Sequence, residues 1–194
     1  MSSIIKWAAL AAGVVSLSGF AATGARAAVT VFGGDNAQAC YQAAKNGLAG
    51  ESYIDECNQA ISFDLLPTKD LAGTYVNRGA VFMTMHAWSE AESDFNHALE
   101  LHPNFGEALV NLGAAQIGQH RDQEGVDTIS KGLALGSMEP EKAYYNRAIG
   151  YEELGDDKNA YFDYLKASQL APNWVAPRQE LVRFTVHQQQ AVTR

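Results

Sequence analysis

Residues 141–174 read EKAYYNRAIGYEELGDDKNAYFDYLKASQLAPNW, and this stretch decides the fold. Apolar and small residues recur every three or four positions on both sides of Gly155, which predicts two helices joined by a turn. Residues 72–105 repeat the pattern closely, and residues 106–139 repeat it less closely. Gly79 and Gly113 are 34 residues apart, and Gly113 and Ala148 are 35 apart. A period of this length indicates a stacked array of helix pairs.

The three stretches resemble the tetratricopeptide repeat family, in which bulky, small and aromatic residues and a proline stand at fixed positions. Residues 72–105 and 141–174 match nearly throughout, whereas 106–139 is degenerate, with Gln116 for an aromatic residue and Pro140 displaced. The resemblance implies an all-α fold, an α-solenoid of antiparallel helix pairs that winds into a right-handed superhelix. The matching residues are Tyr75, Gly79, Phe82, Ala91, Phe95, Ala98 and Pro103, and then Tyr144, Ala148, Tyr151, Ala160, Tyr164, Ala167 and Pro172.

The array is expected to extend on both sides of these repeats. Residues 34–67 align as a degenerate first repeat, with Ala60 matching Ala98. Residues 175–187 combine Leu181 and Phe184 with charged residues, which is typical of the capping helix that such arrays need. Residues 28–36 lack helical periodicity, and we expect them to be flexible.

The first 27 residues have the features of a secretory signal peptide. Lys6 precedes an apolar run over residues 7–20, and Ala25-Arg26-Ala27 offers small residues to a signal peptidase. We expect cleavage after Ala27 and a periplasmic or secreted protein without stable membrane insertion. The alternative is an uncleaved membrane anchor, but the apolar run is shorter than the ~20 residues that a spanning helix needs.

The charge of the chain excludes one class of partner. The formal net charge is −8, and removal of Lys6 and Arg26 with the signal peptide brings it near −10. An acidic chain without a basic stripe repels phosphate backbones, so nucleic acid is not an expected partner.

Cys40 and Cys57 are the two cysteines of the chain. In the alignment they stand at positions seven and 24 of the first repeat, on facing helices of one pair. An even cysteine count in an exported protein favours a disulfide. Closing this loop would contribute roughly 3 kcal/mol in the chain-entropy model. A reactive thiol pair and two free buried thiols are the alternatives.

Two arginines stand where the family usually has leucine. Arg78 and Arg147 occupy position seven, and Asp94 and Asp163 occupy position 23 of the same repeats. The middle repeat has Leu112 and Thr128 there, so both charges are absent together. We interpret these residues as structural ion pairs that join the two helices of a repeat; the alternative is an arginine presented to a ligand.

In the family, the first helix of each repeat faces a concave groove that binds peptides. Position six is asparagine in all three main repeats: Asn77, Asn111 and Asn146. The resemblance implies that these amides grip an extended partner segment, because an asparagine amide both donates and accepts hydrogen bonds. The alternative is that they cap or bridge neighbouring helices.

The neighbouring positions predict an apolar groove and not a basic clamp for a carboxylate. An apolar face of this kind usually marks a protein interface, unless the capping helix or a second copy covers it. The residues expected to line it are Val76, Ala80, Met83, Val110, Ala114, Ile117, Tyr145 and Ile149.

Residues for chemistry do not gather in a recognisable pattern. The histidines have no metal-ligand spacing, and the acidic cluster at Glu152, Glu153, Asp156 and Asp157 surrounds a turn. We therefore expect no enzyme, no metal and no cofactor. The sequence predicts a periplasmic scaffold that binds a protein or peptide; the alternative is a structural or self-associating module, a homo-oligomer without a peptide ligand.

Overall fold

The computed structural model describes residues 25–31 and 34–192, and the apolar run of the expected signal peptide lies outside them. Within the described residues all regular structure is helical. The helices form four consecutive pairs and a final helix: α1 (Asp35–Lys45) and α2 (Glu51–Phe63), α3 (Thr68–Thr84) and α4 (Trp88–Leu101), α5 (Gly106–Gly118) and α6 (Asp122–Ala134), α7 (Pro140–Glu153) and α8 (Asp157–Leu170), and α9 (Val175–Val192).

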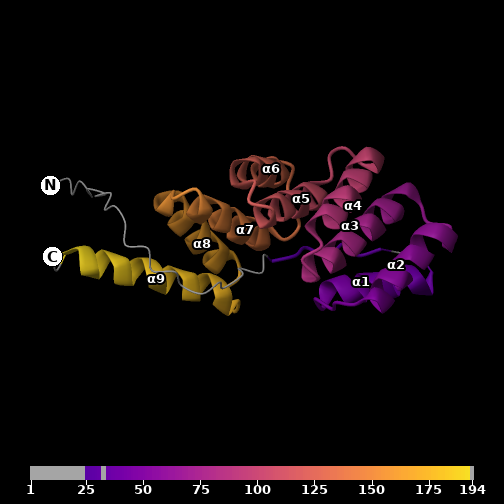
Figure 1. Ribbon diagram of the computed structural model, residues 1–194, viewed down its shortest axis with the longest axis horizontal. Helices are drawn as coiled ribbons and strands as arrows, with labels where there is room; N and C mark the ends of the chain where they lie inside the picture. Colours follow the sequence, from indigo (N-terminus) through magenta and orange to yellow (C-terminus); the bar gives the residue numbers. More distant parts are fainter. Residues whose placement is uncertain (1–24, 32–33, 193–194) are drawn as a thin grey trace.

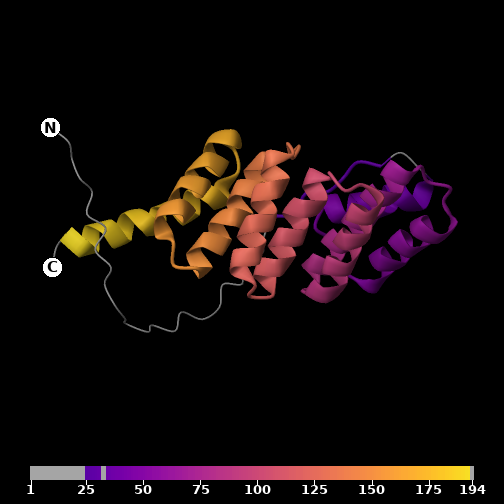
Figure 2. The same ribbon diagram turned by 90° about the horizontal axis from the view of Figure 1, so that it is seen from above.

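The pairs are stacked side by side along the long axis of the molecule (Figure 1). The second helix of each pair packs against the first helix of the next, and α3, α5 and α7 also contact one another in order. Seen from above, the stack runs from α1 and α2 at one end to α9 at the other (Figure 2). The predicted all-α solenoid is therefore confirmed.

Small residues let the two helices of each pair approach closely. In the middle repeat, a Cβ added at Gly113 would lie 2.6 Å from the carbonyl oxygen of Gly125 and 2.6 Å from Cγ1 of Ile129. Gly79 faces the ring of Phe95 in the same way, with its added Cβ only 2.5 Å from Cε1. At this crossing the degenerate middle repeat thus packs the backbone of Gly113 against the backbone of Gly125, whereas residues 72–105 pack Gly79 against the ring of Phe95.

The turn inside each main repeat places one residue in the left-handed region. Gly155 has φ 73°, as expected for a glycine at this position, but His86 and His120 hold φ 57° and 61° at the equivalent places. A side chain destabilises this conformation because its Cβ approaches the following carbonyl oxygen. His86 and His120, whose side chains are exposed, therefore carry backbone strain in these turns.

The predicted first helix pair is present, and the carboxylate of Asp64 links the end of α2 to the start of α1. Asp64, just after α2, accepts hydrogen bonds from the backbone N–H of Ala37 (3.2 Å) and the side-chain amide of Asn36 (3.2 Å). The bond from Ala37 satisfies a backbone donor that the first turn of α1 would otherwise leave without a partner.

Two predicted boundaries need correction. Helix α3 begins at Thr68, ahead of residue 72, and α9 runs to Val192, beyond residue 187. The start of α9 at Val175 agrees with the expected cap, and Leu181 and Phe184 pack on the α7–α8 core with Trp174. In the part of the chain that the structure describes, no helix is both long enough and apolar enough to cross a bilayer.

Candidate peptide-binding groove

Three asparagines stand in line across the stack. Asn77 on α3, Asn111 on α5 and Asn146 on α7 are almost completely buried. We call the face of these three helices that carries them the asparagine groove. A buried amide requires hydrogen-bond partners, because a buried polar atom that lacks a partner costs roughly 1–3 kcal/mol.

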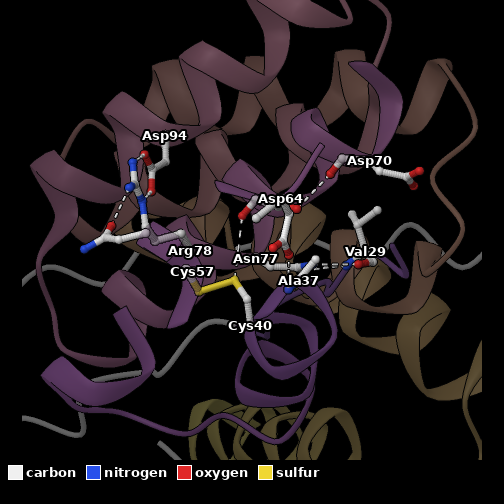
Figure 3. Close-up of a disulfide and its surroundings, with 11 residues drawn as sticks. Val29, Ala37, Cys40, Cys57, Asp64, Asp70, Asn77, Arg78 and Asp94 are labelled. Atoms are coloured by element: carbon white, nitrogen blue, oxygen red, sulfur yellow. Dashed lines mark hydrogen bonds and ion pairs between the residues drawn. A yellow bond between two sulfur atoms is a disulfide. The ribbon is translucent and has the colours of Figure 1, made fainter. Parts of the chain in front are cut away.

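The partners are backbone groups of the chain's own N-terminal segment, residues 25–31. The N–H of Val29 donates to Oδ1 of Asn77 (2.8 Å), and Nδ2 of Asn77 donates to the carbonyl of Val29 (2.7 Å). Asn111 makes the same two bonds with Ala27 (3.2 and 2.8 Å), and Asn146 with Ala25 (2.7 and 2.6 Å). Each amide therefore grips both backbone groups of one residue. Figure 3 shows Asn77 directed toward Val29.

The gripped residues alternate, as in an extended strand. Ala27, Val29 and Val31 are buried, whereas Thr30 between them is exposed. In an extended chain successive side chains point to opposite sides, so every second residue faces the helices. Val31 and Val29 lie against Gly73, where an added Cβ would come within 2.8 and 3.0 Å of their methyl groups. The asparagine groove thus binds the backbone of every second residue of the segment, and it accommodates small side chains at those residues.

The structure gives defined places to most of the segment 28–36, for which the sequence predicted flexibility. Residues 28–31 are held in the groove, and α1 already begins at Asp35. Helical periodicity does not reveal such a segment, because it is extended and its hydrogen-bond partners are side chains. The signal was present as a period of two in Ala25, Ala27, Val29 and Val31.

The predicted apolar lining is not an open face, because all of its residues are buried. Val110 packs against Gly132, and Ile117 fills the space beside Gly125 and Gly150, so both lie between helices. Met83 is likewise buried in the core around α3 and α4, and this placement corrects the expectation that Met83 and Ile117 extend the groove. The other predicted residues are also buried: Val76, Ala80, Ala114, Tyr145 and Ile149.

At the α7 end, the groove opens into a cavity of about 430 Å³ between α1, α7 and the start of α9. Arg26, Lys45 and Lys142 line it together with Tyr145 and Trp174. Burial lowers the pKa of Arg26, and its Nε has no hydrogen-bond partner. Lys142 donates to the carbonyl of Arg26 (2.8 Å) and pairs with Glu139. Three cations thus gather around this cavity.

The structure contains the predicted disulfide. Cys40 on α1 and Cys57 on α2 are fully buried, with their Cα atoms 4.8 Å apart. The bond lies beside the groove end that holds Val29 (Figure 3). It joins the pair of helices whose core has the smallest side chains, mainly alanines.

Both predicted ion pairs are present, and each has two parallel bonds. Arg78 donates to Asp94 through Nε (2.8 Å) and Nη2 (2.6 Å), and Arg147 donates to Asp163 in the same way (2.7 and 3.0 Å). Burial raises the pKa of Asp94, so the carboxylate is costly to keep ionised without its partner. Each arginine bonds to an aspartate on the second helix of its own pair, which agrees with a structural role.

Each arginine also reaches back to the preceding repeat. Nη1 of Arg78 donates to Asn58 on α2 (2.6 Å), and Nη1 of Arg147 donates to Ser130 on α6 (2.9 Å). These contacts were missed by sequence reasoning, although Asn58 and Ser130 share one signal: both stand at position 25 of the preceding repeat, counted from residues 34 and 106. They make each ion pair a link between repeats as well as within one.

The acidic cluster has structural partners. Glu152 accepts hydrogen bonds from Tyr164 (2.5 Å) and Arg183 (2.9 Å), and Asp156 caps the start of α8 by accepting from the N–H of Asn159 (3.2 Å). Within residues 25–31 and 34–192, no group of histidines, cysteines and carboxylates could hold a metal ion.

Comparisons with known proteins agree with this fold. A scan against models of protein families finds no match. The DnaJ homolog subfamily C member 7 homolog of Dictyostelium discoideum is 26% identical over 116 residues, which are 60% of this chain; the chain spans about a fifth (21%) of that relative's length.

Among solved structures, the Arabidopsis OM64 tetratricopeptide domain is similar with a TM-score of 0.57 and 21% identity, over 62% of this chain and 99% of that one. The first tetratricopeptide domain of human RPAP3 has a TM-score of 0.56 and 19% identity, over 60% of this chain and 91% of that one. MamA 41-end from Desulfovibrio magneticus RS-1 has a TM-score of 0.55 and 17% identity, over 82% of this chain and 89% of that one. The chain has the tetratricopeptide-repeat fold, as the sequence resemblance implied.

Proposed function

We propose that the protein is a non-catalytic scaffold, exported to the periplasm, that binds an extended segment of a protein partner in the asparagine groove. One observation carries this proposal: three buried amides each grip the N–H and the C=O of one residue in an extended chain. Such contacts address the backbone, so they suit peptides of varied sequence. The fold shared with tetratricopeptide domains supports a role in protein interaction, and the signal-like N-terminus supports export.

The groove has the energetic properties of a binding site. Each amide–backbone bond contributes roughly 0.5–1.5 kcal/mol net, and six of them act along one strand. The helices that carry the asparagines are fixed by packing on both sides. A rigid site of this kind loses little freedom when a peptide binds, which favours affinity.

Crosslinking in living cells tests the proposal. A photo-reactive amino acid is placed at Lys45, beside the groove cavity, and in a matched control at Asn96, which is exposed on α4. We expect a partner protein to be crosslinked from position 45 and not from position 96, and the product to disappear with Asn111→Ala. Crosslinking that is equal at both positions, or unaffected by Asn111→Ala, would contradict binding in the groove.

A self-associating module is the second candidate, because the groove accepts a segment of this chain's own sequence. If residues 25–27 are retained, residues 25–31 of a second copy could make the same bonds. Light scattering over a wide concentration range distinguishes the candidates, because a monomer at every concentration excludes self-association.

A further inference from the structure

The expected cleavage point falls inside the asparagine groove. The bond between Ala27 and Ala28 lies between the residue gripped by Asn111 and the residue gripped by Asn77. Ala27 is completely buried, so a peptidase cannot reach this bond once the segment is seated. Cleavage during export would therefore precede folding of the groove, and the residues before Ala28 would not take part in it.

Such cleavage divides the groove into an occupied part and an open part. Asn77 keeps both bonds to Val29, and Val31 remains packed against Gly73. Asn111 and Asn146 lose all four of their bonds to Ala27 and Ala25. Their amides keep fixed positions on α5 and α7, so they can bind the backbone of another extended chain.

The open part also specifies side chains. The partner residue that Asn111 binds must be small, because Ala27, which occupies this place here, has no exposed surface. The partner residue that Asn146 binds must also be small, because Ala25 packs there against the α7–α8 core. The residue between them enters the cavity lined by Lys45 and Lys142. Arg26 fits poorly there, since its Nε has no hydrogen-bond partner and two further cations, Lys45 and Lys142, line the same cavity.

Among the described residues, a single salt bridge joins a carboxylate to this cluster, from Glu139 to Lys142. Lys45 lies over the ring of Tyr41, 5.6 Å from its centroid. A partner carboxylate at the place of Arg26 would meet these cations within a partly buried cavity, where charge attraction is stronger than in open water.

We propose that removal of the chain up to Ala27 opens the Asn111 and Asn146 positions to an extended partner segment of the form small–acidic–small, while Val29 keeps Asn77 closed. The proposal rests on the proposed function and gives it a ligand class and a register. The partner runs in the same direction as residues 25–27, from α7 toward α5.

The test uses the protein as cells export it, with its first residue determined by intact mass. The probes are two fluorescent peptides of residues 22–28, one unchanged and one with Arg26→Asp, and fluorescence anisotropy measures their binding. We expect an exported chain that begins at Ala28 and binds the Arg26→Asp peptide about tenfold more tightly than the unchanged one. In the exported protein, Asn111→Ala and Asn146→Ala should each weaken binding about tenfold, and Asn77→Ala less than about twofold.

A second preparation provides the control. Its signal sequence is exchanged so that cleavage leaves Ala25 as the first residue, and it should not bind the peptides because its own residues 25–27 fill the groove. The proposal is overturned by a different first residue in the exported protein, by equal binding to both preparations, by a preference for the unchanged peptide, or by an equal effect at Asn77. Those results leave a partner crosslinked at Lys45 intact, so the proposed function can stand when this inference fails.

Discussion

The contribution of the ion pair between Arg147 and Asp163 to stability can be tested directly, because the middle repeat lacks this pair and shows which residues can replace it. The pair has two parallel bonds, and the side chains are 19% and 10% exposed. Arg147→Leu removes the guanidinium and leaves the Asp163 carboxylate in a poorly solvated position. Breaking a buried pair costs about 3–5 kcal/mol, and the partial exposure places this one near 3 kcal/mol.

The double variant Arg147→Leu/Asp163→Thr copies Leu112 and Thr128 of the middle repeat. We expect its free energy of unfolding to lie within about 1 kcal/mol of the parent, because no carboxylate is left without a partner. The coupling energy between the two sites, which is the sum of the two single losses minus the loss of the double variant, is then at least about 2 kcal/mol, measured from urea unfolding curves of all four proteins. A single substitution should lower the melting temperature by about 6–12 °C.

Arg121→Leu is the matched control. Arg121 pairs with Glu92 and Glu124, but its side chain is 35% exposed, so the loss should stay below about 1 kcal/mol. The reasoning is refuted if the double variant of the buried pair is as unstable as the sum of its single changes, or if the exposed control costs as much as Arg147→Leu.

Three further predictions concern stability. His120→Gly should stabilise the protein by roughly 0.5–1 kcal/mol in urea unfolding, because it relieves the left-handed backbone that Gly155 already accommodates; a loss of stability would contradict this. Burial raises the pKa of Tyr145 from 10.0 to about 12, so its contribution is complete below pH 10 and is lost as the pH rises toward 12. Tyr145→Phe should therefore flatten the fall of unfolding free energy between pH 10 and 12, by roughly 2 kcal/mol, and an unchanged slope would count against it. Cys57→Ser should cost about 3 kcal/mol in the oxidised protein and little once the parent is reduced.

The sequence by itself determined the architecture. A period of 34 or 35 residues with small residues at helix crossings leaves few ways to bury the apolar faces, so the helix pairs, the disulfide between Cys40 and Cys57 and the ion pairs could be inferred from repeat positions. These features depend on residues close in the chain or at equivalent places in each repeat. For the same reason the asparagine at position six was recognisable as a repeated feature of the first helices.

Only the tertiary structure decided what the asparagines hold. Their partners, Ala25, Ala27 and Val29, lie up to 121 residues away in the chain, and they belong to a segment whose period of two was overlooked. A strand normally obtains its hydrogen bonds from another strand, and here side-chain amides on three helices supply them. That arrangement exists only after the repeats have stacked and aligned their first helices. The same stacking decided which apolar residues became core, because Val110 packs against Gly132 and Ile117 packs against Gly125 and Gly150 once the helices are in place.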